Sequence, residues 1–177
     1  MTEPTECYAQ YPLRIVFLSN LVSIAMYAIG AYIIYQLGFI WLAPYLVYIF
    51  WLEIRLLKKS CTNCYYYGKT CGFGKGKLSA ILFKKGNAET FIQRRITWKD
   101  ILPEFLVSLV PLIVGIGLLV IHFDFLILAL IVLLVALTTA GNAFVRGNLV
   151  CNHCKQREIG CPAQELFNQN KRQPNTK

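Results

Sequence analysis

The stretch FLILALIVLLVALTTAGNAFV, residues 125–145, decides the fold. It holds no charged side chain, and as a helix it is long enough to cross the ~30 Å hydrocarbon core of a bilayer, which needs about 20 apolar residues. Three more apolar runs precede it, at residues 15–35, 39–52 and 101–121. The second of these is the shortest and contains Pro44. The sequence therefore predicts an all-α integral membrane protein with four transmembrane helices.

Composition and chain connections support this class and indicate how the helices pair. Hydrophobic residues make up 56% of the 177 residues, and the mean hydropathy is +0.48, which is more apolar than an ordinary soluble domain. Very short connections at residues 36–38 and 122–124 join the runs two by two. Because helices joined so tightly lie antiparallel, the expected fold is two tandem helical hairpins, at residues 15–55 and 101–146.

Cationic residues set the expected orientation. Of the 18 Lys and Arg residues, 11 lie in residues 55–99, six lie from residue 146 onward, and Arg14 precedes the first run. The two short connections contain none, and cationic loops stay on the cytoplasmic side. We therefore expect a protein of the cell membrane with both termini in the cytoplasm. This bias and the attraction to anionic headgroups explain the net charge of +9, and no nucleic-acid-binding motif accompanies it.

The segments outside the hairpins are expected in the cytoplasm. They are an N-terminal segment (residues 1–14), a central loop (56–100), a second cysteine segment (147–167) and a polar tail (168–177) whose composition is typical of disorder. Residues 77–85, KLSAILFKK, suit a short helix that lies in the headgroup region or packs on the cysteine segments. At the cytoplasmic ends of the spans, Glu53 and Glu104 are expected to pair with Arg55 or Lys99.

Six of the seven cysteines form two triplets with the same C-x2-C-x6-C spacing. The triplets begin 90 residues apart, and they are Cys61, Cys64 and Cys71, then Cys151, Cys154 and Cys161. Each follows a pair of apolar runs, so the sequence predicts a duplication whose halves are related by an axis along the membrane normal. Cytoplasmic thiols are kept reduced, and this favours metal binding over a disulfide framework.

The identity of the metal stays open between two alternatives. Paired C-x2-C turns are typical of zinc, so Cys61, Cys64, Cys151 and Cys154 would form one four-thiolate site, with Cys71 and Cys161 unassigned. In the other alternative, each full triplet holds an iron–sulfur cluster. The step Cys161–Pro162 resembles the last Cys-Pro of bacterial ferredoxins, although the x6 spacing departs from their x2. Redox-active thiols without metal are a third reading, and one shared site or two separate sites both fit.

Two more residues are considered as ligands, and the functional classes follow from the metal. Cys7 is a candidate fourth ligand, and His153 lies inside the second C-x2-C, but a surface thiol and a turn residue are the simpler interpretations. Iron would indicate an electron-transfer or redox-complex subunit. Zinc would indicate a stapled scaffold or assembly protein whose basic face binds a protein partner or a second copy. Beyond the thiols, the sequence offers no acid, base or nucleophile set that would indicate a self-standing enzyme.

Overall fold

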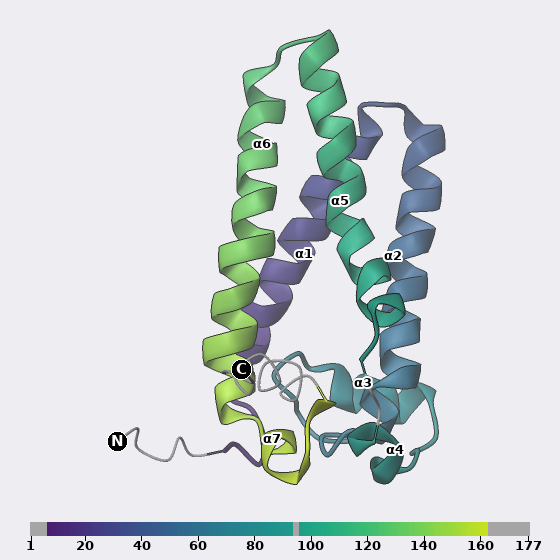
Figure 1. Ribbon diagram of the computed structural model, residues 1–177, viewed down its shortest axis with the longest axis vertical. Coiled ribbons are helices and arrows are strands. Elements are labelled where there is room, and N and C mark those ends of the chain that lie inside the picture. The colour runs from purple at the N-terminus through teal and green to yellow at the C-terminus, as the bar shows by residue number, and fades with distance from the viewer. Residues whose placement is uncertain (1–6, 94–95, 163–177) are drawn as a thin grey trace, which may run out of the picture.

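Four long helices dominate the computed structural model, which describes residues 7–93 and 96–162 (Figure 1). They are α1 (Leu13–Tyr35), α2 (Phe39–Lys59), α5 (Trp98–Ile121) and α6 (Phe125–Ala136). The short helices are α3 (Lys75–Leu82), α4 (Ala88–Ile92) and α7 (Gln156–Ile159). Single turns and wider helical turns complete the described part, and they are η1 (Cys61–Asn63), η2 (Leu137–Gly141), η3 (Ala143–Val150) and η4 (Cys151–His153).

The prediction of four helices able to cross a membrane is confirmed. Their continuous helical stretches are Leu13–Tyr35, Phe39–Asn63, Trp98–Ile121 and Phe125–His153. The second is longer than the apolar run at residues 39–52, because α2 continues through Lys59. Pro44 does not break it: the residue lies early in α2, so its ring and missing N–H disturb only the first turns.

The fourth stretch changes its winding where polar residues begin. α6 gives way at Leu137 to the wider π-type turns of η2 and η3. At this point the Thr138 hydroxyl donates to the Leu134 carbonyl at 2.8 Å, and the Thr139 hydroxyl donates to the Val135 carbonyl at 2.7 Å. These side chains compete for the carbonyls that regular helical hydrogen bonds use, which is how Thr commonly perturbs a helix.

Helix α1 lies at the centre of the bundle and contacts α2, α5 and α6. Ile33 of α1 is fully buried and packs against Ile131 and Leu134 of α6. The Tyr45 hydroxyl of α2 donates to the Val107 carbonyl of α5 at 2.9 Å, and joins the other side of the bundle. In the most apolar part of each of these helices, only 11% to 28% of the residues are buried inside the protein. The apolar surface that remains exposed suits contact with lipid.

The short helices and both cysteine segments gather at one end of the bundle (Figure 1). α3 falls where residues 77–85 predict a helix, and Gly76 and Ser79 turn toward the other segments while Ile81 is 79% exposed. The small residues of α3 thus pack against neighbouring segments, while its large apolar side chains face outward. We call this end, residues 60–93 and 151–162 with residues 7–12, the cap. The expected tail at 168–177 lies outside the described residues.

Candidate functional site

Both C-x2-C sequences fold into the same turn. In each, the N–H of the second cysteine donates to the carbonyl of the first at 3.4 Å, from Cys64 to Cys61 and from Cys154 to Cys151. The next bond also matches, because Tyr67 N–H donates to the Cys64 carbonyl and Arg157 N–H to the Cys154 carbonyl, both at 3.0 Å. The backbone leaves each turn extended, with φ −83° at Cys64 and −85° at Cys154.

The two turns also bind each other reciprocally. Tyr65 N–H donates to the Oε1 atom of Gln156 at 2.7 Å, and Lys155 N–H donates to the hydroxyl oxygen of Tyr66 at 3.0 Å. Positions 65 and 155 follow the second cysteine of their turns, and positions 66 and 156 come next. Each turn therefore offers the same donor and the same acceptor position to the other. This is the contact pattern that a two-fold axis generates, so the turns are arranged about an approximate local two-fold axis.

The second cysteines of both turns contact one core. Cys64 and Cys154 pack, with Cys71, against the buried cluster that Tyr66 helps to form. Thiols of both triplets therefore line the same part of this end of the bundle.

Burial makes these thiols weak acids. It raises the pKa of the Cys154 thiol to about 11, and negative charge on Cys64 or Cys161 adds to that shift. It also raises the pKa of Cys64. The backbone N–H of Gln156 acts in the opposite direction on Cys154 and lowers its pKa, as the N–H of Tyr66 does on Cys64. These two N–H groups again occupy equivalent positions, and they are placed to stabilise a thiolate.

The third cysteine of each triplet is placed differently by its local backbone. Cys71 Sγ accepts a hydrogen bond from Gly76 N–H at 3.3 Å, at the start of α3. Cys161 follows Gly160, whose φ of +127° favours glycine. Cys151 is exposed, whereas the other five cysteines of the two triplets are partly buried, and none of the described cysteines forms a disulfide.

The thiols do not yet form a complete ligand set. In residues 7–93 and 96–162, no three His, Cys, Asp or Glu side chains are gathered closely enough to hold a metal ion as they stand. A centre built from these thiols therefore requires their sulfur atoms to move together when a metal binds. Such coupling of local folding to binding is common in small thiolate sites.

The N-terminal segment, which the sequence indicated only as a cytoplasmic end, joins the two turns. Tyr8 N–H donates to the His153 carbonyl at 3.0 Å, and the Tyr8 carbonyl accepts from the Tyr66 hydroxyl at 2.6 Å. The Tyr11 hydroxyl donates to the Val150 carbonyl at 2.6 Å. Tyr66 and Tyr11 are 2% and 4% exposed. The sequence signal for them was slight, because tyrosines beside a membrane are more often interfacial.

Cys7 and His153 lie beside the second turn. Burial, followed by a hydrogen bond with Glu158, raises the pKa of the Cys7 thiol. The His153 ring packs against the Tyr8 ring in a tilted arrangement, with centroids 5.0 Å apart. Both residues therefore have contacts of their own in the cap.

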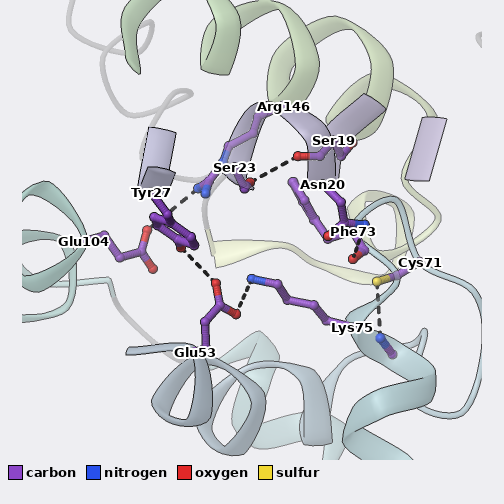
Figure 2. A network of polar contacts seen from close by, with 11 residues as sticks. Ser19, Asn20, Ser23, Tyr27, Glu53, Cys71, Phe73, Lys75, Glu104 and Arg146 are labelled. Atoms are coloured by element: carbon purple, nitrogen blue, oxygen red, sulfur yellow. Dashed lines mark hydrogen bonds and ion pairs between the residues drawn. The ribbon is translucent and has the colours of Figure 1, made fainter. Parts of the chain in front are cut away.

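An ion pair fastens the cap to the helices. Lys75 Nζ at the start of α3 lies 2.6 Å from a carboxylate oxygen of Glu53 in α2, and the other carboxylate oxygen accepts from the Tyr27 hydroxyl of α1 at 2.8 Å (Figure 2). Glu53 does pair with a cation, but its partner is Lys75 rather than the expected Arg55 or Lys99, because the central loop brings Lys75 back under α2. Arg55 pairs with Asp100 at 3.6 Å.

The same figure shows the second acidic residue at this level. Glu104 of α5 lies 3.7 Å from Arg146 of η3, in a half-exposed pair (Figure 2). An open pocket of about 570 Å³ lies between α1, α2 and α3 beside the Lys75–Glu53 pair. The polar contacts at this end of the bundle therefore connect α1 and α2 to the cap, and α5 to the fourth helical stretch.

Comparison of the chain with protein-family models, with curated proteins and with solved structures finds no match. The class that the fold supports is a membrane protein with four helices long and apolar enough to span the bilayer. The residues that indicate its function lie in the cap.

Proposed function

We propose that this chain is a non-catalytic scaffold or interaction protein of the cell membrane, stapled by metal. In this proposal, two tandem helical hairpins each continue into a cytoplasmic C-x2-C-x6-C segment, and the two segments share one thiolate centre of the zinc class. Both termini face the cytoplasm. The observation that carries the proposal is the reciprocal bonding of the two turns, from Tyr65 to Gln156 and from Lys155 to Tyr66.

Contact of both triplets with one core favours a shared centre over one cluster per triplet. Cys64 and Cys71 of the first triplet and Cys154 of the second all pack against the cluster around Tyr66. A cubane cluster held by three cysteines would need each triplet to enclose its own cluster. Thiols that face across an approximate two-fold axis suit ions that both halves ligate, and such ions would join the first half of the chain to the second.

The cap has a small core, so a bound metal would stabilise its fold. The buried core of the cap is formed by Tyr11, Tyr66, Val145 and Val150, two of which come from the end of the fourth helical stretch. Segments of fewer than ~40 residues seldom fold on such a core without metal, disulfides or a partner. Metal binding would supply the missing folding free energy, since the ligands converge only on binding.

The cap surface suggests what the scaffold binds. Exposed lysines lie on it at positions 77, 84 and 85, and two more, at positions 58 and 59, end α2 beside it. An acidic surface of a cytoplasmic protein, or anionic lipid headgroups, would complement this charge. A second copy of the chain would not, because it carries the same net charge of +9.

Electron transfer by an iron–sulfur centre is the second candidate function, and the exposure of Cys151 favours it. A ligand at the surface would leave one edge of a shared cluster open to a soluble redox partner. The tetrahedral thiolate environment suits iron as well as zinc.

The experiment that tests the proposal is the metal and acid-labile sulfide content of anaerobically purified protein, with its visible spectrum. We expect zinc without sulfide, in a colourless protein, and no metal in a variant with all six triplet cysteines changed to serine. Cys7→Ser is the matched control and should keep its metal. Iron with equal sulfide would establish the second candidate, and absence of any metal from the wild-type protein would refute metal binding.

A further inference from the structure

The geometry points to a binding site for one zwitterionic phospholipid in the pocket between α1, α2 and α3. A phosphoethanolamine headgroup, which carries one phosphate and one ammonium, would bind at the Lys75–Glu53 pair, and the first part of an acyl chain would lie along the apolar wall beside it. The site is separate from the thiols and does not depend on metal binding.

One face of each of two helices lines the pocket. The lining residues of α1 and of α2 both follow the i, i+3, i+4, i+7 spacing that places side chains on one helical face. They are Asn20, Ser23, Ile24 and Tyr27 in α1, and Leu46, Ile49, Phe50 and Glu53 in α2. Seven residues of helix rise about 10 Å, so the pocket runs along the helices for about that length. Its volume of about 570 Å³ is within the range of ~300–1,000 Å³ found for ligand sites.

The walls from α1 and α2 are apolar and stay exposed in the described part of the chain. Ile24 is 62% exposed and Phe50 is 68% exposed. Glu53 directly follows the apolar run at residues 39–52, so these walls lie within the span and the Lys75–Glu53 pair lies at its end. In a bilayer, acyl chains meet such a wall and headgroups lie beside the end of a span. A lipid is therefore the ligand that reaches both parts of the pocket.

Charge at the polar end selects the headgroup. Lys75 Nζ lies 2.6 Å from Glu53, and the two side chains remain 19% and 28% exposed (Figure 2). Because the neighbouring pair of Glu104 and Arg146 is balanced as well, no excess positive charge favours an anionic lipid here. An ammonium has three N–H donors, and the contact with Glu53 needs only one, so Lys75 can also donate to a phosphate. A carboxylate accepts about four hydrogen bonds, so Glu53 can accept from an ethanolamine ammonium.

The end of the pocket is held in place by hydrogen bonds between α1 and the loop before α3. Asn20 Nδ2 donates to the Phe73 carbonyl at 3.3 Å and to the Val16 carbonyl of its own helix at 2.8 Å. Gly74 then turns the chain into α3 with a φ of +70°, which favours glycine. A Cβ atom at Gly74 would meet a Val16 methyl carbon at 3.1 Å, so glycine lets α3 begin this close to α1. A pocket formed in advance lowers the cost of ordering a ligand.

Native mass spectrometry of the full-length protein in detergent, after delipidation, tests the inference. We expect one phosphatidylethanolamine per chain to rebind, about tenfold more tightly than phosphatidylglycerol or phosphatidylcholine with the same acyl chains. A tenfold difference is the size of one charge-assisted hydrogen bond. Preference for phosphatidylglycerol, equal binding of the three lipids, or failure of every lipid to bind would each overturn the inference.

Matched variants locate the bound lipid. Ile24→Trp fills the apolar wall and should abolish lipid retention. Ile113→Trp is the control, because Ile113 in α5 is 60% exposed and lies outside the pocket, and it should retain the lipid. Equal retention by the two variants would place the lipid elsewhere and overturn the inference.

A charge variant tests the headgroup. Glu53→Gln leaves the charge of Lys75 unbalanced, so we expect phosphatidylethanolamine to bind about tenfold more weakly and phosphatidylglycerol to become the preferred lipid. An unchanged preference would overturn the assignment of the headgroup. Helical circular dichroism of each variant separates loss of lipid from loss of the fold, and the headgroup preference of the wild-type protein decides alone if a variant does not fold.

Discussion

The Tyr66 hydroxyl links three segments of the chain. It donates to the Tyr8 carbonyl at 2.6 Å and accepts from Lys155 N–H at 3.0 Å. Tyr66→Phe keeps the ring but leaves both backbone groups without this partner. We expect unfolding of the cap to become easier by about 1–3 kcal/mol, the cost of a buried group that loses its hydrogen bond. Thermal unfolding of the purified protein measures it.

Tyr65→Phe is the control for that prediction, since it removes a hydroxyl from the neighbouring ring. The Tyr65 hydroxyl makes no hydrogen bond among residues 7–93 and 96–162. Its loss should change stability by less than about 0.5 kcal/mol, as at most surface positions. Equal effects of the two substitutions would show that the Tyr66 bonds do not hold the cap together.

Gly76 occupies a position where a side chain does not fit. A Cβ atom there would collide with the backbone carbonyl oxygens of Tyr66 and Lys69, and these cannot move without distorting the turn that carries Cys64. Gly76→Ala should therefore lower the melting temperature and weaken metal retention. Gly117→Ala is the matched control, because a Cβ atom at Gly117 in α5 meets nothing within 4 Å. That control should leave stability unchanged or raise it by up to about 1 kcal/mol.

The raised thiol pKa of Cys154 predicts a pH profile for the metal-free protein. With a pKa of about 11, Cys154 is protonated at neutral pH, and its thiolate fraction rises tenfold per pH unit up to that value. Alkylation by iodoacetamide, followed by peptide mass spectrometry, should therefore keep accelerating from pH 7 to pH 10. An ordinary thiol levels off near its pKa of ~8.5, as the denatured protein should. Levelling off at that pH in the folded protein would contradict the burial.

At the scale of elements, the joint between α2 and α3 depends on one partly buried ion pair. The Lys75 and Glu53 side chains are 19% and 28% exposed, and Glu53 also accepts from Tyr27. Glu53→Gln keeps a carbonyl acceptor for Tyr27 but removes the charge opposite Lys75. We expect a loss of about 1–3 kcal/mol, typical of a charge-assisted hydrogen bond, measured by chemical denaturation.

Glu104→Gln gives the comparison on a neighbouring helix. Its pair with Arg146 is longer, at 3.7 Å, and both side chains are about half exposed, at 50% and 52%. Exposed pairs of this kind contribute about 0–1 kcal/mol. If Glu104→Gln costs as much as Glu53→Gln, burial does not distinguish the two pairs.

Apolar run length was enough to predict the four long helices, because backbone groups in lipid require continuous helix. It did not predict where α2 ends, because α2 continues to Lys59 through polar residues that lie beyond the apolar run. The contacts within the cap were harder to predict. The cysteine spacing marked the two turns, but the pairing of Glu53 with Lys75 depends on where a glycine-rich loop returns, and residue pattern does not encode that path.

At the scale of the whole molecule, long-range contacts decide the cap. Tyr11 and Val150, joined by a hydrogen bond of 2.6 Å, are 139 positions apart in the chain. Neither has a neighbour in sequence that signals the contact. The equivalence of the two cysteine spacings was visible in the sequence, yet the reciprocal bonds at Tyr65 and Gln156 needed coordinates, since Gln156 has no counterpart of its own type at Tyr66.

The orientation of the molecule in the membrane gives the last prediction. Gln36 and Lys85 are both exposed, at opposite ends of the bundle, and neither belongs to a cysteine triplet. If the cationic segments are cytoplasmic, a membrane-impermeant maleimide should label Gln36→Cys in intact cells, but Lys85→Cys only after permeabilisation. Because both sites are exposed in the folded protein, the difference reports the membrane rather than burial. Labelling of Lys85→Cys in intact cells would place the cap outside, where an oxidising environment would favour disulfides over a thiolate metal centre.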